Sequence, residues 1–212
     1  MTGTVRRHAT FLFIAFLSGA LCACAGFPRM GGYSDALTAE EHVKLGTIYD
    51  EQRLPGRAED EFRAALRQRP RMTAAFVGLG NLAFQRGAVE EAHAHYAQAL
   101  QTEPGDARAN NNLAMVYLTR GERLEEAERL IQTALAREGP IKPYALDTLA
   151  ALYRRQGRYT EALDALEEAA RIAPAGHEAL HEHLAESRRD VMAAMSSGGG
   201  KTPAAERGPS SD

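Results

Sequence analysis

The segment PAGHEALHEHLAE, which begins at Pro174, contains the residue pattern by which helical zinc peptidases hold their metal. His177, Glu178 and His181 have the H-E-x-x-H spacing, which on a helix places two imidazoles on one face with a carboxylate beside them. In such a site the histidines bind Zn²⁺ and the glutamate acts as general base on a zinc-bound water. A metallopeptidase is therefore the first function to test against the rest of the chain.

The surrounding sequence argues against a zinc site. A catalytic zinc requires a third protein ligand, and the glycine and histidine of the extended metzincin motif are not in place after His181. Only the rest of the same helix and a tail rich in Gly, Pro and Ser follow, so no later helix can supply a glutamate. We predict no catalytic residue, no metal and no cofactor. His177 and His181 are interpreted as side chains at the edge of a helix interface.

Composition and cysteine placement narrow the choice of function. The 212 residues are 44% hydrophobic and 25% charged, and the formal net charge is −3. This balance is typical of a globular chain and lacks the basic excess of a nucleic-acid-binding domain. The two cysteines, Cys22 and Cys24, both lie near the N-terminus. An internal disulfide framework and a cysteine-based zinc site are therefore excluded.

The first residues have the organisation of a secretory signal peptide. Arg6 and Arg7 form a basic region, and an apolar run of eleven residues follows from Phe11 to Leu21. A run of this length is too short to span a bilayer, which takes about 17–25 residues. It matches the hydrophobic region of a signal peptide instead.

The signal peptide ends in a sequence that resembles the bacterial lipobox. Leu21 stands three residues before Cys24, and the small residue Ala23 stands directly before it. The resemblance implies that residues 1–23 are removed and that Cys24 is lipidated. Several acyl chains hold a protein on a membrane far more firmly than one. Because Ala25 and not Asp follows, the resemblance further implies an outer membrane lipoprotein facing the periplasm.

The body of the chain repeats one pattern four times. Each copy begins with a Leu followed directly by Gly or Ala, and Tyr or Ala stands four residues after the Leu. An Ala, a large residue and a second Ala follow at spaced positions, and a Pro ends the copy. The leucines of the four copies are 34, 34 and 36 residues apart: Leu45, Leu79, Leu113 and Leu149. Self-similarity at such a period is the signature of repeat architectures.

The repeated pattern resembles that of the tetratricopeptide repeat (TPR) family, whose period is 34 residues. The resemblance implies an all-α fold, an α-solenoid of four TPR helix pairs plus a C-terminal capping helix. Residues 24–37 then form a lipidated tether, residues 176–195 the capping helix and residues 196–212 a disordered tail. The four repeats occupy residues 38–175, at about 39–72, 73–106, 107–142 and 143–175.

Local signals agree with these helix boundaries. Thr38 and Glu41 form a capping-box start, and proline follows each second helix, which it cannot continue. The glycines expected to end first helices in a left-handed conformation are Gly87, Gly121 and Gly157. The prolines are Pro70, Pro104, Pro140 and Pro174, and the expected apolar stripe of the capping helix is Leu180, Leu184, Val191 and Met195.

The sequence departs from the family pattern in two ways. Other residues stand where the family often has Trp: His42, Phe76, Asn110 and Leu146. The third repeat also contains one extra residue between Tyr117 and Ala127 and another between Ala134 and Pro140. We expect both extra residues to lie in turns.

TPR arrays bind peptides on the face lined by their first helices, and the resemblance implies such a groove here. One end of it is acidic, the middle is apolar and the other end is basic. The apolar side chains would be exposed without a partner, and the asparagines could bond to a ligand backbone. The predicted peptide-binding residues are Asp50, Glu51, Asn81, Phe84, Asn111, Asn112, Met115, Leu118, Arg154 and Arg155.

The sequence thus predicts a membrane-anchored periplasmic scaffold that binds protein partners, a peptide or a helix, and does not bind nucleic acid. The architecture resembles the TPR lipoproteins of tight-adherence or type IV pilus assembly, which implies a role in an envelope machine such as a pilus or a secretion system. An adaptor for peptidoglycan hydrolases is an alternative. A zinc metallopeptidase using HEALH is the alternative of a different class.

Overall fold

The computed structural model describes residues 35–198, and within this range the chain forms helices and no strands. None of these helices is long and apolar enough to cross a membrane. The predicted signal peptide, the lipidation site Cys24 and residues 199–212 of the predicted tail lie outside the described residues, whereas residues 196–198, which the sequence analysis assigns to that tail, belong to the last helix. The helices are α1 (Ala39–Glu51), α2 (Pro55–Gln68), α3 (Thr73–Gln85), α4 (Val89–Thr102), α5 (Ala107–Arg120), α6 (Leu124–Leu135), α7 (Lys142–Arg155), α8 (Tyr159–Ile172) and α9 (Glu178–Gly198).

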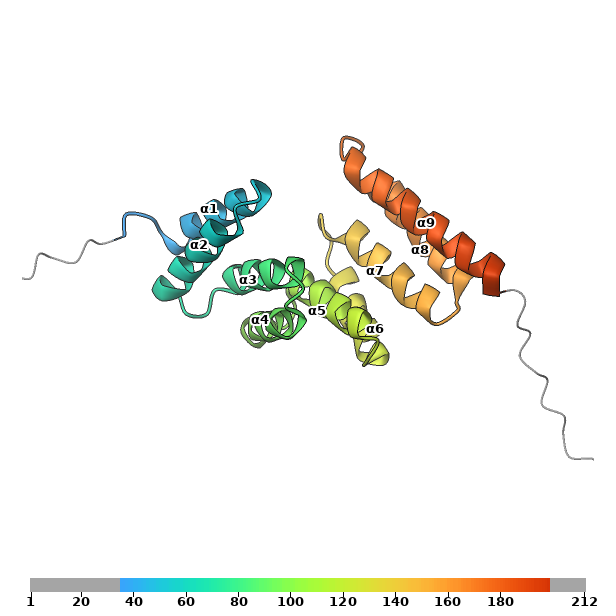
Figure 1. The fold of residues 1–212 in the computed structure, drawn as a ribbon, viewed down its shortest axis with the longest axis horizontal. Coiled ribbons are helices and arrows are strands. Elements are labelled where there is room, and N and C mark those ends of the chain that lie inside the picture. The colour runs from blue at the N-terminus through green and yellow to red at the C-terminus, as the bar shows by residue number, and fades with distance from the viewer. Residues whose placement is uncertain (1–34, 199–212) are drawn as a thin grey trace, which may run out of the picture. The chain divides into compact units, whose positions relative to one another are not determined.

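The helices form consecutive pairs that stack on one another (Figure 1). Within the pairs, α1 contacts α2, α3 contacts α4, α5 contacts α6 and α7 contacts α8. Each second helix also contacts the first helix of the next pair, and each first helix contacts the next first helix, up to α9. In the described range the second helices do not contact each other. The first helices therefore form one continuous layer, and the predicted all-α solenoid is confirmed.

The helix ends follow the local signals of the sequence. The Thr38 backbone N–H donates to Oε2 of Glu41 at 2.7 Å, and the Glu41 N–H donates to Oγ1 of Thr38 at 3.3 Å, which completes the predicted capping box. Positive φ angles of 78°, 69° and 75° follow the first helices of the later repeats, as predicted for Gly87, Gly121 and Gly157. In the first repeat the same position is occupied by Arg53, with φ 60°.

The third repeat places both extra residues in turns, as expected. The first is accommodated after Gly121, where Arg123 adopts a left-handed conformation with φ 53°. The second lies in the connection between α6 and α7. One detail of the prediction is wrong: α6 ends at Leu135, five residues before Pro140. The turn around Gly139 (φ 149°) intervenes, so Pro140 does not end this helix.

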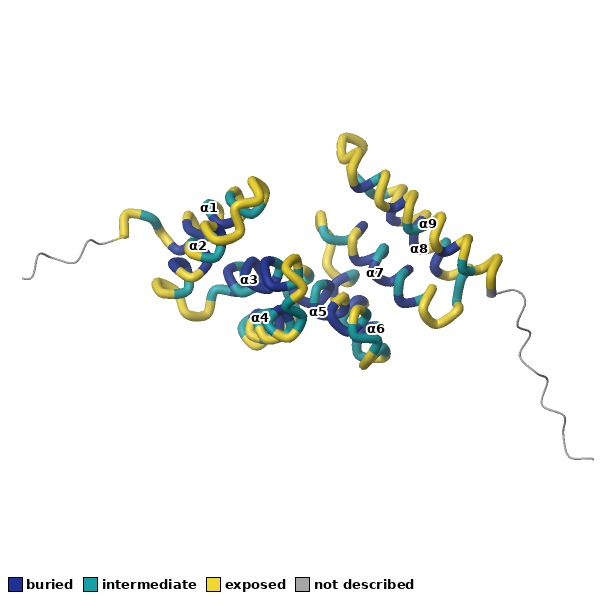
Figure 2. Tube along the Cα trace, in the orientation of Figure 1, coloured by how far each residue is buried: buried dark blue, intermediate teal, exposed yellow. Residues whose placement is uncertain are grey.

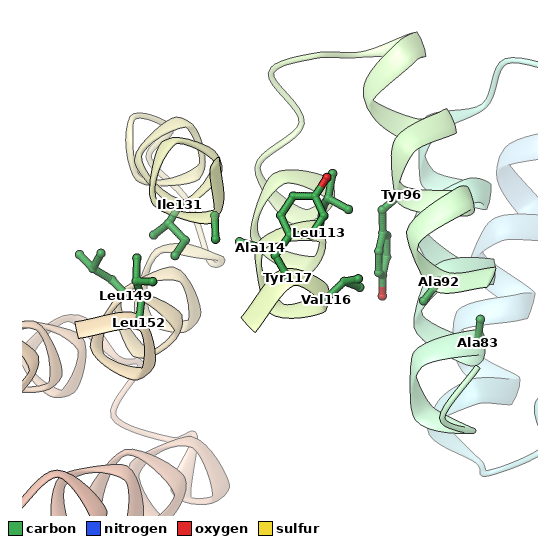
Figure 3. Close-up of a cluster of buried hydrophobic side chains, with 11 residues drawn as sticks. Ala83, Ala92, Tyr96, Leu113, Ala114, Val116, Tyr117, Ile131, Leu149 and Leu152 are labelled. Carbon is green, nitrogen blue, oxygen red and sulfur yellow. The ribbon is translucent and has the colours of Figure 1, made fainter. Parts of the chain in front are cut away.

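The core combines small residues with large aromatic rings that pack directly against them. Fully buried alanines recur on the second helices, and Figure 2 shows buried positions in every helix pair. A Cβ atom added to Gly46 would lie 2.7 Å from the Phe62 ring, and one on Gly78 would lie 2.5 Å from it. Tyr96, which is 2% exposed, approaches Gly80 in the same way. Figure 3 shows Tyr96 in the cluster that joins α3 to α7.

Polar residues at two of the family's Trp positions are buried because they find partners. His42 is 4% exposed, and its Nδ1 lies 2.6 Å from Oε2 of Glu61. Asn110 is 2% exposed, and its Nδ2 donates to the carbonyl oxygens of Pro104 and Asp106, both at 2.9 Å. These hydrogen bonds offset the cost of removing the polar groups from water.

The final helix, α9, covers the last pair. Leu180, Leu184 and Val191 are buried against the apolar side chains of α8, as the sequence predicts. Met195 was expected on the same stripe, but its side chain is 47% exposed. The stripe closes at Val191, after which α9 presents Met192 and Met195 to solvent.

Candidate functional site

The layer of first helices contains a cleft of about 470 Å³ at its C-terminal part. The side chains come from three consecutive members of the layer, α5, α7 and α9, of which α5 contacts α7 and α7 contacts α9. The lining residues are Met115, Leu118, Thr119, Asp147, Thr148, Ala151, Arg154, Arg155 and Ala194.

One side of the cleft is apolar. Leu118 packs against the core cluster with part of its side chain still accessible, and Met115 is 38% exposed. Ala151 and Ala194 add small side chains that leave room above α7 and α9. Exposed apolar side chains lining a hollow, together with a few polar groups, are typical of a binding site.

Charged side chains complete the cleft. Arg155 Nη1 donates to the Leu118 carbonyl oxygen at 3.3 Å, which fixes the guanidinium beside the apolar residues. The Arg154 side chain forms no hydrogen bond or ion pair with any residue that the structure describes, so its charge is available. Asp147 Oδ2 lies 2.9 Å from Nε2 of His183, a residue of α9. Two arginines thus stand at one end of the cleft and a half-buried carboxylate stands on the preceding turns of α7.

Four of the residues predicted for the groove come together in this cleft: Met115, Leu118, Arg154 and Arg155. The acidic residues Asp50 and Glu51 do not line it, since they end α1 two pairs earlier. Oδ2 of Asp50 accepts a hydrogen bond of 3.3 Å from Nε2 of Gln85 on α3.

The remaining predicted groove residues serve the packing between helices. Phe84 is half-buried against the core cluster. Asn111 is 2% exposed, and Asn112 donates from Nδ2 to Oδ1 of Asn81 at 2.8 Å. The Asn81 oxygen also accepts from the Tyr96 hydroxyl at 2.9 Å. The amides of Asn81 and Asn112 are therefore engaged within the protein, whereas Asn111 is kept from a ligand by its burial, with its Oδ1 lacking a hydrogen-bond partner among the described residues.

Five residues line the cleft that are not among the predicted peptide-binding residues: Thr119, Asp147, Thr148, Ala151 and Ala194. Ala194 comes from α9, which the sequence pattern predicts only as a helix that caps the core. The helix length is the signal that could have revealed it, because α9 has 21 residues whereas the repeat helices have 12 to 14. Its last turns extend past the buried stripe and reach the face of α7.

The HEALH segment forms the start of α9. Nδ1 of His177 accepts a hydrogen bond of 3.3 Å from the Leu180 N–H, as a helix-capping side chain does. Its Nε2 lies 3.4 Å from the Tyr144 hydroxyl, and Nε2 of His181 lies 3.1 Å from the Pro174 carbonyl oxygen. In the described part of the chain, no three His, Cys, Asp or Glu side chains are arranged to hold a metal ion. The pattern thus has a structural explanation in how α9 begins.

Solved structures with the same fold include two bacterial proteins, PilW and PilF. The type IV pilus biogenesis factor PilW superimposes with a TM-score of 0.60 and 18% identity, covering 73% of this chain and 78% of that one. PilF of Pseudomonas aeruginosa gives a TM-score of 0.55 and 22% identity, covering 74% of this chain and 73% of that one. At these identities the likeness concerns the fold.

A human protein shares sequence with part of the chain. Protein O-mannosyl-transferase TMTC1 of Homo sapiens is 32% identical over 133 residues, which is 62% of this chain. The matched stretch spans only 15% of the length of that protein. The similarity therefore concerns a small part of the human protein and says nothing about the rest of it.

Two family models, both described as tetratricopeptide repeat, match consecutive parts of the chain. One covers residues 43–107 and the other residues 105–175. Together they include α2 to α8 and most of α1, which are the helices that form the paired stack. The chain belongs to the tetratricopeptide repeat family.

Proposed function

We propose that the protein is a membrane-anchored periplasmic scaffold that captures a segment of a protein partner in the cleft between α5, α7 and α9. The cleft is the observation that carries the proposal. It combines apolar side chains that are accessible in the isolated chain with two arginines at one end. TPR proteins typically serve as scaffolds for protein partners.

The chemistry of the cleft defines the partner segment. Met115, Leu118 and Ala151 take an apolar side chain, and burial of that side chain supplies most of the affinity. Arg154 and Arg155 take a carboxylate, because a planar guanidinium matches it in two parallel hydrogen bonds. Charges at the rim of an interface set orientation and association rate more than affinity. The expected ligand is a short segment in which an apolar residue is followed by Asp, Glu or a terminal carboxylate.

The proposed location rests on the N-terminal sequence. The basic residues, the apolar run and the lipobox-like Leu21 to Cys24 favour export and lipidation at Cys24. The likeness to PilW, a type IV pilus biogenesis factor, favours pilus assembly among the possible envelope machines. Mass spectrometry of the mature protein tests the anchor: we expect acyl chains on Cys24, and Cys24→Ser should release the protein from membranes. A Cys24→Ser protein that stays in the membrane fraction would refute the lipid anchor.

Capture of partners from envelope extract tests the binding role. The full chain is cross-linked in extract, the partner is identified, and its peptides are titrated by fluorescence anisotropy. Arg154→Glu and Met115→Asp should each weaken binding at least tenfold, which corresponds to about 1.4 kcal/mol. Arg67→Glu is the matched control, because Arg67 is exposed on α2, away from the cleft. Equal affinity of the Arg154→Glu and Arg67→Glu proteins would disprove the cleft assignment.

A further inference from the structure

Ile48 of α1 is exposed at a position that the other repeats bury. Its side chain is 46% exposed, whereas the equivalent Leu82, Val116 and Leu152 are 3%, 0% and 0% exposed. The reason is the stacking order, since the second helix of each pair packs on the first helix of the next. In the described range no helix precedes α1, so Ile48 lies on the open end of the stack.

A charged and apolar stripe follows this face of α1. Lys44, Ile48 and Glu51 are spaced i, i+4 and i+7 and so share one face of the helix. Lys44 and Glu51 are exposed, and neither side chain forms a hydrogen bond or an ion pair with a described residue, although the Lys44 ammonium is within electrostatic reach of Glu41 on the same helix. From the N-terminal to the C-terminal end, the stripe reads positive, apolar, negative.

Three of the five cleft-lining residues of α7 form the complementary stripe. Asp147, Ala151 and Arg154 have the same i, i+4 and i+7 spacing and all line the cleft. From the N-terminal to the C-terminal end, this stripe reads negative, small, positive. Both stripes span about 10 Å, at about 1.5 Å per residue. A helix laid parallel to α7 in the register of α1 would place each charge opposite its counterion and Ile48 above Ala151.

We propose that α1 of one copy of the chain docks in the cleft of a second copy. The docking is of the helix-in-groove kind, with Ile48 as the apolar anchor. Glu51 pairs with Arg154, and Lys44 approaches Asp147, whose Oδ1 is not used by His183. The inference rests on the proposed role of the cleft as a protein-binding surface, and it adds that the chain carries its own ligand for it.

Such docking has two consequences. The surfaces in contact are different on the two copies, so association runs head to tail and produces a series of oligomers or a closed ring. A second copy and a foreign partner would also compete for the same cleft. A partner must then displace α1, and self-association regulates how many clefts are open.

A site-directed disulfide tests the docking directly. Full-length chains in which Cys22 and Cys24 are replaced by Ser, so that no native thiol competes, receive either Ile48→Cys or Ala151→Cys. The two chains are purified separately, mixed and mildly oxidised, and the products are separated without reductant. We expect a cross-linked pair from the mixture. The matched control replaces the exposed Gln132 of α6 by Cys in the first chain, and it should give only background. If the Ile48→Cys and Ala151→Cys mixture gives no more cross-linked product than this control, the proposal is overturned.

A charge-reversal experiment tests the register of the docked helix. Glu51→Arg should reduce the cross-link yield about tenfold, because like charges across an interface are strongly unfavourable. Adding Arg154→Glu to the cleft chain should restore it. A yield unaffected by Glu51→Arg would contradict the register. If Ile48→Asp lowers the Tm of the dilute monomer by several degrees, the chain's own residues cover α1 and the proposal fails.

The two proposals fail separately. Ile48 is not among the cleft residues, so Ile48→Asp should abolish self-association and leave partner capture intact. Capture without an Ile48–Ala151 cross-link would refute self-docking alone. If the cross-link forms but no partner is captured from extract, the binding of a foreign partner is refuted and self-docking is not.

Discussion

Asn112 donates a hydrogen bond of 2.8 Å to Oδ1 of Asn81 and thereby joins α5 of the third repeat to α3 of the second. The same oxygen accepts from the Tyr96 hydroxyl of α4 at 2.9 Å. One amide oxygen thus satisfies donors from two other helices. Tyr96 is 2% exposed, so water offers little replacement for this acceptor.

Replacement of Asn81 by Ala should destabilise the protein by about 1–3 kcal/mol, because a buried donor left without an acceptor bears the full cost of its desolvation. Urea unfolding, with the slope of the transition checked against the parent, measures the free energy of unfolding. Gln98→Ala on the exposed face of α4 is the control and should change it by less than about 0.5 kcal/mol. If Asn81→Ala costs no more than the control, the hydrogen bonds contribute nothing to stability.

The ionisation of Tyr96 should make the protein less stable at high pH. Burial raises the pKa of the Tyr96 hydroxyl well above its usual range, which is near 10 in an unfolded chain. The unfolded state therefore releases this proton at lower pH than the folded state. The stabilising contribution is complete below pH of about 10 and is lost as the pH rises toward the folded-state pKa. Denaturant unfolding between about pH 9 and 11 should show a shallower decline in Tyr96→Phe than in the parent.

The sequence was sufficient for features that depend on residues close together in the chain. The capping box needs only Thr38 and Glu41, and a left-handed turn needs only a glycine at the helix end. Repetition at a fixed spacing then identified the helix pairs, because the alanines that admit neighbouring helices recur in each copy. These signals predict helices and their pairing without knowledge of distant contacts.

The candidate site depends on contacts that the sequence does not encode locally. The basic residues Arg154 and Arg155 are predicted groove residues, and both line the cleft. Asn112 was expected to be available, but its amide bonds to an asparagine 31 residues away. Ala194 lines the cleft because α9 extends beyond its buried stripe. The helical period indicates on which face of its helix a residue lies. Which side chains it contacts on that face depends on how far the neighbouring helix extends.

Adding a methyl group at Gly80 should destabilise the stack by about 1–3 kcal/mol. The new Cβ would lie 2.7 Å from Cδ1 of Tyr96, and the bond from the hydroxyl to Asn81 prevents the ring from moving away. Gly56→Ala is the matched control, since that Cβ meets no atom within 4 Å. Thermal unfolding should therefore show a lower Tm for Gly80→Ala and an unchanged or raised Tm for Gly56→Ala, because Ala favours the helix. Equal Tm values would mean that the Tyr96 ring adapts.

Arg53 should be replaceable by Gly with a gain in stability of about 0.5–1 kcal/mol. Its φ of 60° lies in the left-handed region, which is unfavourable for a residue with a Cβ atom, and Gly87, Gly121 and Gly157 occupy the equivalent position elsewhere. The reciprocal variant is Gly157→Ala, whose Cβ would meet no atom within 4 Å, so any loss reports the backbone alone. Urea unfolding should place the two variants on opposite sides of the parent. A loss of stability in Arg53→Gly would show that the arginine side chain contributes more to α1 than its backbone conformation costs.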